Sequence, residues 1–306
     1  MPLKIIFMGT PEFAVPILKT IHDSKHEILA VYTQSPKKKN RGLKKFFSPV
    51  QSFAEKNELN VRSPEKINSE KELDYLKKSN PDVIIVVAYG KILPKKMLSI
   101  PNIHFINIHA SLLPKWRGAA PIQRSLMNSE KETGISIMKI IEELDAGPII
   151  LQEKLKVEKE DNFLSLSKKL SLLGSKLIID TLNILESGKY KFINQDSKKA
   201  TYAKKILKSE SQIDWSNSSN IIISKIKGLN PFPGTWFKHK NNRIKIIDAS
   251  EINKNGKKGE VIDDNLTIAC GNGALKVEKI QKEGKKILDT KSFLAGYQIK
   301  KGETLI

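Results

Sequence analysis

An asparagine and a histidine two residues apart, with an aspartate further along the chain, are the side chains in this sequence best suited to chemistry. Asn107 and His109 end an apolar segment, and Asp145 precedes Ala146-Gly147. On a β-strand, residues i and i+2 point to the same face, so the amide and the imidazole are aimed together. An amide that stabilises an oxyanion, an imidazole that exchanges protons and a carboxylate that orients the imidazole suit acyl transfer by direct attack of a substrate amine.

Other interpretations of these residues are open. A single histidine is commonly a buried structural residue, and an aspartate before Ala-Gly commonly forms a turn. Ser111 is the nearest hydroxyl, but no G-x-S-x-G pattern surrounds it, which argues against a serine hydrolase. No G-x-G-x-x-G follows the first apolar segment, which argues against a nicotinamide-binding oxidoreductase.

The elements that position these residues alternate between strands and helices. Apolar, β-branched segments predict strands at 3–8, 28–32, 82–88 and 102–108. Gly9-Thr10-Pro11 predicts a turn with Thr10 as the cap of the first helix, and Ser48-Pro49 announces another helix. Apolar residues at helical spacing predict a long helix over 162–187. The alternation is typical of an α/β fold with a doubly wound, Rossmann-like parallel sheet, which binds ligands at the carboxyl ends of its strands.

The last third of the sequence indicates a different architecture. Residues 190–208 are rich in Lys, Ser, Asn and Gln, as in a linker. The segments that follow are short and separated by Pro, Gly and Asn turns, which predicts a small OB-like β-barrel. We therefore expect a catalytic domain at 1–189, a linker at 190–208 and a C-terminal β-barrel domain at 209–306.

Composition narrows the setting in which the protein works. Cys270 is the single cysteine, so no intramolecular disulfide forms, and no Cys/His cluster has metal-binding spacing. The N-terminus lacks the features of a signal peptide, and no apolar run reaches the length of a membrane span. We expect a soluble, cytoplasmic protein without a metal and without membrane contact.

The charge indicates a polyanionic partner. The formal net charge is +20, and residues 190–306 hold 23 Lys and Arg against 12 Asp and Glu. Basic side chains gain affinity for nucleic-acid phosphates by releasing counterions. Because only five of the 53 basic residues are arginines, a coding bias toward lysine is an open alternative.

The segment that follows Asn107 resembles a known signature. It reads Asn107-Ile108-His109-Ala110-Ser111-Leu112-Leu113-Pro114, and with the later Asp145-Ala146-Gly147 it is similar to the N-x-H, S-L-L-P and D-x-G motifs of the tetrahydrofolate-dependent formyltransferases. The resemblance implies that Asn107, His109 and Asp145 are catalytic and that 10-formyltetrahydrofolate is the formyl donor, without a metal. The candidate folate-binding residues are Tyr89, Gly90, Ser111, Leu112, Leu113 and Pro114.

Further motifs resemble the branch of this family that formylates methionyl-tRNA, and the similarity extends over nearly the whole chain. They are Met8-Gly9-Thr10-Pro11-Glu12-Phe13, Trp116-Arg117-Gly118-Ala119-Ala120-Pro121-Ile122 and a basic segment at 37–45, in which Arg41 takes the place of an arginine that serves tRNA recognition. Lys37-Lys38-Lys39-Asn40 departs from the Pro/Gly-rich, Arg-containing stretch more usual there. The resemblance implies initiator methionyl-tRNA as substrate, a monomer and no stable protein partner. The candidate tRNA contacts are Arg41, Lys37, Lys38, Lys39, Lys44, Lys45 and Arg117.

Two rival functions are distinguishable by sequence features. A formyltransferase for a small amine, or a hydrolase that deformylates the same folate, requires neither the basic segment 37–45 nor the C-terminal domain. A nucleic-acid-binding module without activity explains the charge but leaves Asn107, His109 and Asp145 without a role. The sequence therefore favours the tRNA-directed enzyme.

Overall fold

The chain divides into two compact units in a computed structural model that describes residues 1–39 and 44–306. The first unit comprises Met1–Gly118, Glu132–Lys156 and Ser167–Tyr202, and the second comprises Ala119–Lys131, Val157–Leu166 and Ala203–Ile306. Residues 190–202, expected within a linker, are thus part of the first unit. The functional division that we expect, at 1–189 and 209–306, stays a prediction.

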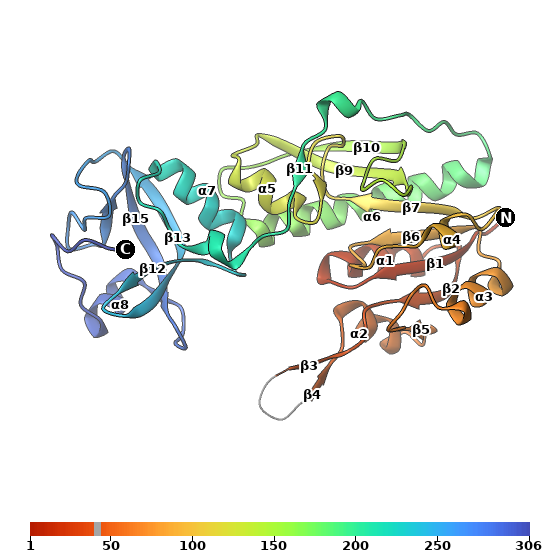
Figure 1. Cartoon of the computed structure of the whole chain (residues 1–306), viewed down its shortest axis with the longest axis horizontal. Helices are drawn as coiled ribbons and strands as arrows, with labels where there is room; N and C mark the ends of the chain where they lie inside the picture. Colours follow the sequence, from red (N-terminus) through yellow and green to blue (C-terminus); the bar gives the residue numbers. More distant parts are fainter. Residues whose placement is uncertain (40–43) are drawn as a thin grey trace. The chain divides into compact units, whose positions relative to one another are not determined.

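The first unit is built on a seven-stranded sheet in the order β10-β9-β7-β6-β1-β2-β5 (Figure 1). The strands from β7 to β5 are parallel, which confirms the Rossmann-like fold, and β9 and β10 add an antiparallel pair at one edge. The strands are β1 (Lys4–Gly9), β2 (Glu27–Tyr32), β5 (Val61–Arg62), β6 (Val83–Val87), β7 (His104–His109), β9 (Glu132–Lys139) and β10 (Ile149–Lys156).

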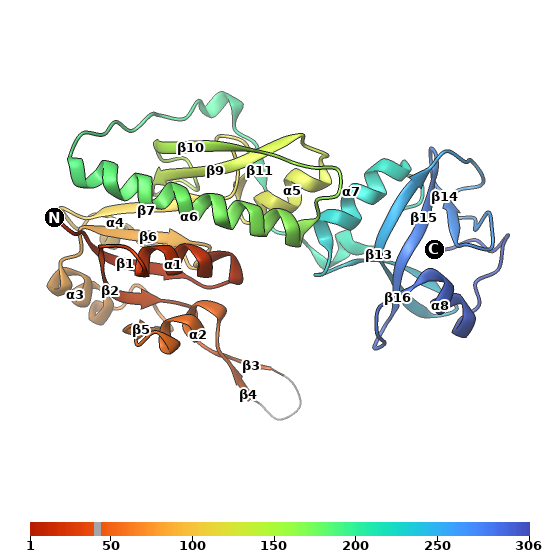
Figure 2. The same cartoon turned by 180° about the vertical axis from the view of Figure 1, so that it is seen from behind.

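Helices cover both faces of this sheet. Helices α1 (Val15–His22) and α6 (Phe163–Ser187) lie over one face (Figure 2). A Cβ added at Gly174 of α6 would lie 3.2 Å from Ile17 of α1 and 3.4 Å from Ile108 of β7, so glycine allows this close packing. Because Ile108 faces α6, the alternation of a strand turns Asn107 and His109 to the opposite face.

The opposite face carries α3 (Glu70–Ser79) and α4 (Lys95–Leu98). Leu76 of α3 and Met97 of α4 are fully buried in one cluster with Ile6 and Ile84 of the sheet. Phe105 of β7 belongs to the same cluster. The strand that carries Asn107 and His109 is therefore anchored in apolar packing two residues before the first of them.

The first helix begins differently from the prediction. Pro11 is extended (φ −81°, ψ 172°), and a 3-10 turn, η1 (Glu12–Ala14), precedes α1. The Thr10 hydroxyl does not cap a helix and instead donates to the Tyr89 carbonyl at 2.9 Å. This bond joins the loops that follow β1 and β6 at the carboxyl edge of the sheet.

The remaining short elements of the first unit follow the turn signals. Helix α2 (Pro49–Lys56) is capped by Ser48, whose hydroxyl accepts from the Gln51 N–H at 3.0 Å. Strands β3 (Lys37–Lys39) and β4 (Lys44–Phe46) form an antiparallel hairpin. The other elements are β8 (Arg117–Gly118), η2 (Ser197–Lys199) and β11 (Tyr202–Ala203).

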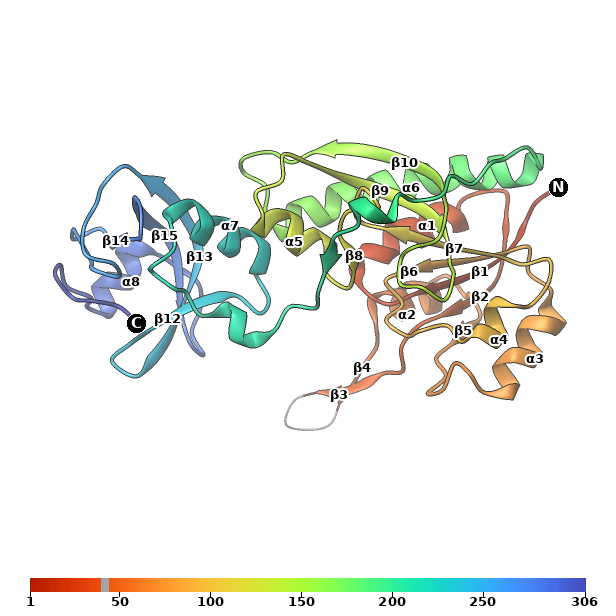
Figure 3. The ribbon, with the colours of Figure 1, turned by 45° about the horizontal axis from the view of Figure 1, so that its top comes forward.

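The second unit contains a curled antiparallel sheet, a half-barrel, in the order β12-β13-β15-β14 (Figure 3), and β16 pairs with β15 (Figure 2). The pairing of β13 with β15 shifts register next to Asp248, and such a bulge bends the strands. The barrel-like domain that the turn spacing predicted is thus confirmed as a half-barrel. The elements of the second unit are α5 (Pro121–Met127), η3 (Lys208–Ser211), α7 (Ser219–Leu229), β12 (Thr235–His239), β13 (Asn242–Ile252), β14 (Thr267–Ala269), β15 (Ala274–Lys282), β16 (Leu288–Asp289) and α8 (Thr290–Gly296).

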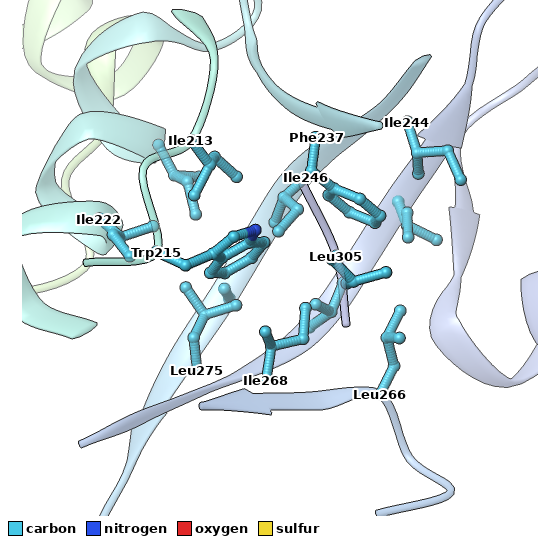
Figure 4. Packing of buried hydrophobic residues seen from close by; sticks show 14 of the residues in the cluster. Ile213, Trp215, Ile222, Phe237, Ile244, Ile246, Leu266, Ile268, Leu275 and Leu305 are labelled. Atoms are coloured by element: carbon cyan, nitrogen blue, oxygen red, sulfur yellow. The ribbon is translucent and has the colours of Figure 1, made fainter. Parts of the chain in front are cut away.

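The half-barrel encloses its own core (Figure 4). Trp215 packs against Phe237 with ring centroids 5.9 Å apart, and Leu275 and Leu305 are buried in the same cluster. Such a core stabilises the unit by burying apolar surface.

No helix in the described part of the chain is long and apolar enough to cross a membrane.

Candidate active site

Asn107 and His109 lie where β7 ends, at the carboxyl edge of the parallel strands. Asn107 pairs with Val86 of β6 on one side and Met138 of β9 on the other, and His109 pairs with Ser136. The His109 side chain is only 6% exposed. In open α/β sheets, this edge is where ligands bind.

Asp145 is brought to both residues by the loop between β9 and β10. The Asn107 Nδ2 donates to Asp145 Oδ1 over 3.4 Å, and His109 Nδ1 lies 3.6 Å from Asp145 Oδ2. The second N–H of the Asn107 amide remains for another acceptor. The structure therefore assembles one amide, one imidazole and one carboxylate that are up to 38 positions apart in the sequence.

The His109 ring is held through one of its two nitrogens. Its Nε2 lies 2.9 Å from the carbonyl oxygen of Trp116, to which the ring N–H donates. Its Nδ1 faces the Asp145 carboxylate at a distance longer than a hydrogen bond. The Trp116 carbonyl therefore accepts from Nε2–H, and Nδ1 is the nitrogen that remains available to a substrate.

The Asp145 loop is held by the backbone around it. Asp145 has a left-handed backbone (φ 48°), and its Oδ2 accepts a 2.8 Å hydrogen bond from the Gly118 N–H. A Cβ at Gly147 would lie 1.7 Å from the Lys139 carbonyl oxygen, so only glycine fits there. The spacing Asp-x-Gly thus places the left-handed backbone of Asp145 two residues before a close contact with β9.

Gln195 and Arg117 also contact this loop, from distant parts of the sequence. The Gln195 Nε2 donates to the carbonyls of Asp145 and Gly147 at 2.8 and 2.7 Å, and Arg117 Nε donates to Gln195 Oε1 at 3.1 Å. Arg117 Nη1 donates to Glu143 Oε1 at 3.1 Å. No motif marks Gln195, because it stands alone in a polar stretch with linker composition.

The candidate folate residues flank this site on two loops. Tyr89 is buried, and its hydroxyl has no hydrogen-bond partner among the described residues. Gly90 has a left-handed backbone (φ 79°), which favours glycine, and a Cβ there would displace the Gln34 amide, whose Nε2 would lie 2.2 Å away. Burial raises the Tyr89 pKa to about 12, which keeps this phenol a neutral donor.

The Ser111–Pro114 segment is fixed largely through its backbone. Ser111 is fully buried, its hydroxyl donates to the Lys115 carbonyl at 2.6 Å, and its own carbonyl accepts from the Ser136 hydroxyl at 2.7 Å. Leu113 is buried as well, whereas Leu112 and Pro114 are partly exposed. Folate contacts by these four residues stay predictions, and the two exposed side chains are the better placed.

The candidate tRNA residues fall into two groups. Five of them belong to the paired strands of the β3-β4 hairpin: Lys37, Lys38, Lys39, Lys44 and Lys45. Arg41 lies outside the described residues. Arg117 is only 1% exposed and is bonded to Gln195 and Glu143. A contact between Arg117 and tRNA stays a prediction, and its burial favours a role in holding the site.

The second unit has a cleft of its own, about 360 Å³ in volume. Arg243 stacks over the Trp236 ring at 4.1 Å beside it, and Phe232, which is 74% exposed, is also at its wall. Trp236 is buried, so Phe232 is the exposed ring of this cleft, and an exposed aromatic ring beside cations is typical of surfaces that bind nucleic acid. The lining residues are Lys208, Ser211, Phe232, Pro233, Trp236, Arg243, Lys245, Gln281, Glu283 and Gly284.

In the described ranges, no group of three or more His, Cys, Asp or Glu residues is arranged to hold a metal ion.

Comparison with known proteins shows to which protein family the chain belongs. Residues 3–182 match the formyl transferase family, and residues 205–298 match the formyl transferase C-terminal domain. The fold is thus that of a formyl transferase. The chain belongs, more narrowly, to the methionyl-tRNA formyltransferase family.

Full-length similarity supports that assignment. The chain is 50% identical to the methionyl-tRNA formyltransferase of Pelagibacter ubique strain HTCC1062, over 100% of this chain and 99% of the relative. It is 40% identical to the enzyme of that name from Parvibaculum lavamentivorans, over 99% and 100%.

Solved structures share the fold at lower identity. HypX from Aquifex aeolicus in complex with tetrahydrofolic acid is 16% identical, with a TM-score of 0.67 over 100% of this chain and 51% of that one. An N-formyltransferase from Helicobacter canadensis in complex with folinic acid and dTDP-3-aminofucose is 19% identical, with a TM-score of 0.66 over 92% and 100%. These neighbours support the fold alone.

Proposed function

We propose that the protein transfers the formyl group of 10-formyltetrahydrofolate to the amino group of methionine carried by initiator tRNA, which gives N-formylmethionyl-tRNA for translation initiation. The observation that carries the proposal is the meeting of Asn107, His109 and Asp145 at the carboxyl edge of a formyl transferase sheet. The full-length relatives named methionyl-tRNA formyltransferase support this acceptor over a small amine.

In the reaction, these three residues stabilise an oxyanion, exchange protons and orient the imidazole. The unprotonated methionyl nitrogen attacks the formyl carbon, and the formyl oxygen becomes an oxyanion that the free Asn107 N–H and the His109 Nδ1–H stabilise. The bond from this carbon to N10 of the folate then breaks. N10 gains a proton while the former amine loses one, and His109, oriented by Asp145, exchanges these protons.

Two residues on the loops that follow β6 and β7 carry buried donors that a polar co-substrate can satisfy. The Tyr89 hydroxyl and the Trp116 indole N–H are buried donors without a partner in the part of the chain described. Buried donors are costly unless an acceptor satisfies them, and the polar heterocycle of a folate offers several acceptors.

Binding of tRNA involves the basic segment 37–45 and the second unit. The cleft of the second unit combines Lys208, Arg243 and Lys245 with aromatic side chains, which suits a nucleic-acid backbone without base-specific contacts. The protein acts as a monomer in the cytoplasm. Cys270 fits a reducing compartment, since it is buried as a free thiol and burial raises its pKa to about 11.

Labelled formyl transfer from 10-formyltetrahydrofolate tests the proposal. Methionyl-initiator-tRNA and glycinamide ribonucleotide are offered separately, and a third reaction contains no acceptor. We expect label to appear on the methionine of the tRNA only. Formylation of the ribonucleotide instead would identify a small-amine transferase, and release of free formate without an acceptor would identify a hydrolase.

A further inference from the structure

Gln195 uses its entire side-chain amide on the candidate active site. Its two N–H groups reach the carbonyls of Asp145 and Gly147, at 2.8 and 2.7 Å, and its oxygen accepts from Arg117 Nε at 3.1 Å. The two carbonyls lie on either side of Ala146. One side chain thus binds both ends of the Asp-Ala-Gly turn.

The segment that carries Gln195 is itself tied to the first unit on both sides. Ile193 and Ile149 exchange two backbone hydrogen bonds of 2.8 Å, which fixes the segment beside β10. Further along, the Thr201 hydroxyl and carbonyl accept from the backbone N–H groups of Trp116 and Arg117, each at 2.9 Å. Gln195 therefore projects from an anchored segment.

The Asp145 turn needs such an external support. A left-handed backbone at a residue other than glycine is strained, and it persists only where its surroundings hold it. The Gly118 N–H holds the carboxylate, whereas Gln195 holds the carbonyls of the turn. A shift of about 1 Å at this turn is enough to remove the Asp145 carboxylate from its place between Asn107 and His109.

We propose that Gln195 is a positioning residue for formyl transfer: its side-chain amide fixes the Asp145–Gly147 turn, and Arg117 fixes the amide. Gln195 acts through Asp145 and touches no reacting atom. This role rests on the proposed function, and it assigns the segment 193–201 to the active site rather than to a linker.

Two substitutions distinguish the hydrogen bond between Gln195 and Arg117 from the two hydrogen bonds that Gln195 donates to the turn. Gln195→Met keeps the length of the side chain and removes all three bonds, whereas Gln195→Glu keeps an acceptor for Arg117 and removes both donors to the turn. We expect each to lower kcat by about 10–10²-fold, with little change in KM for either substrate. Asn194→Leu, at an exposed neighbouring position, is the matched control and retains full activity.

A double-mutant cycle with Asp145→Asn separates positioning from general support of the fold. If Gln195 acts through Asp145, adding Gln195→Met to Asp145→Asn lowers the rate by less than about 3-fold, because the group that it positions is already lost. Equal effects of Gln195→Met in both backgrounds would overturn the proposal. So would full activity of Gln195→Glu, since that variant retains only the bond to Arg117.

Hydrogen exchange at the Gly118 amide reports how firmly the Asp145 carboxylate is held, and it does not depend on catalytic turnover. Gly118 donates to the Asp145 carboxylate, so we expect its exchange to accelerate about 10-fold or more in Gln195→Met and to stay unchanged in Asn194→Leu. Unchanged exchange in Gln195→Met would overturn the positioning role. An enzyme inactive on methionyl-tRNA that still shows the accelerated exchange would remove the proposed function and leave the positioning of Asp145 intact.

Discussion

The Gly118 N–H and the Asp145 carboxylate form the shortest link between the two loops that frame the candidate active site, at 2.8 Å. Gly118 belongs to the Trp-Arg-Gly motif and Asp145 to the Asp-x-Gly motif, so the bond joins two sequence signatures. Because this bond is shorter than the 3.6 Å separation from His109 Nδ1, the carboxylate is fixed by backbone and not by the imidazole. Asp145 is thus placed before any substrate arrives.

Replacing Asp145 tests whether its charge matters. Asp145→Asn keeps an oxygen for the Gly118 N–H but removes the negative charge beside His109. We expect the formylation rate to fall by about 10²–10⁴-fold with the melting temperature nearly unchanged. Asp23→Asn, an exposed carboxylate elsewhere in the first unit, serves as control. Normal turnover by Asp145→Asn would reduce Asp145 to a turn residue.

The cleft of the second unit predicts a salt effect. Lys208→Gln combined with Lys245→Gln removes two of its cations, so tRNA binds more weakly and the slope of log K against log salt becomes less steep by about 1–2. Binding of the folate stays unchanged. Lys77→Gln with Lys78→Gln removes the same charge from α3 as a control. Equal slopes for all three proteins would show that the cleft does not contact the tRNA backbone.

The basic segment 37–45 predicts a difference between arginine and lysine. Arg41 is its only arginine, and a guanidinium binds a phosphate through two parallel bonds that an ammonium does not form. We expect Arg41→Lys to raise the KM for tRNA several-fold and to leave the KM for folate unchanged. Lys77→Arg, which also preserves the charge and lies exposed on α3, is the control. Identical kinetics of Arg41→Lys and the wild type would mean that Arg41 contributes charge alone.

An ion pair within the second unit predicts a pH dependence of stability. Arg124 donates to both oxygens of Glu210, at 2.6 and 3.0 Å, and this hydrogen bonding lowers the pKa of Glu210. A carboxylate whose pKa is lower in the folded protein stabilises it above the unfolded pKa and loses this effect as the pH falls through the folded pKa.

Glu210→Gln should therefore lower the free energy of unfolding by about 1 kcal/mol near neutral pH. The difference from the wild type should begin to shrink near pH 4.5, the ordinary pKa of a glutamate in the unfolded chain, and be lost as the pH falls through the lower pKa of folded Glu210. Urea unfolding of both proteins across this range measures it, with the exposed Glu160→Gln as control. A difference that stays constant down to pH 3 would mean that the charge of Glu210 does not contribute.

The sequence predicted those features that depend on local periodicity. The parallel strands and the long helix α6 follow from apolar runs and helical spacing, and the shared face of Asn107 and His109 follows from the alternation of a strand. Thr10 was expected to cap a helix, but a carbonyl from another loop competes for its hydroxyl. A local pattern holds no information about that carbonyl.

The same reason explains Gln195 and Arg117. Arg117 was expected to contact tRNA, which stays a prediction, and its hydrogen bond to Gln195, 78 positions away, could not be seen in the local sequence. Gln195 binds backbone carbonyls, which any sequence provides, so no motif marks it. Positions of this kind become visible only when the fold brings distant segments together.

Single-turnover formyl transfer by the Asn107→Ala and His109→Ala variants is the most direct measurement of the central claim. Enzyme in excess, loaded with 10-formyltetrahydrofolate, is mixed with methionyl-initiator-tRNA, so that the observed rate reports the chemical step. The account predicts a rate about 10²–10⁴-fold below wild type for each variant, with folate affinity retained and with His22→Ala unaffected. A rate within a few-fold of wild type in either folded variant would contradict the assignment of the active site to the end of β7.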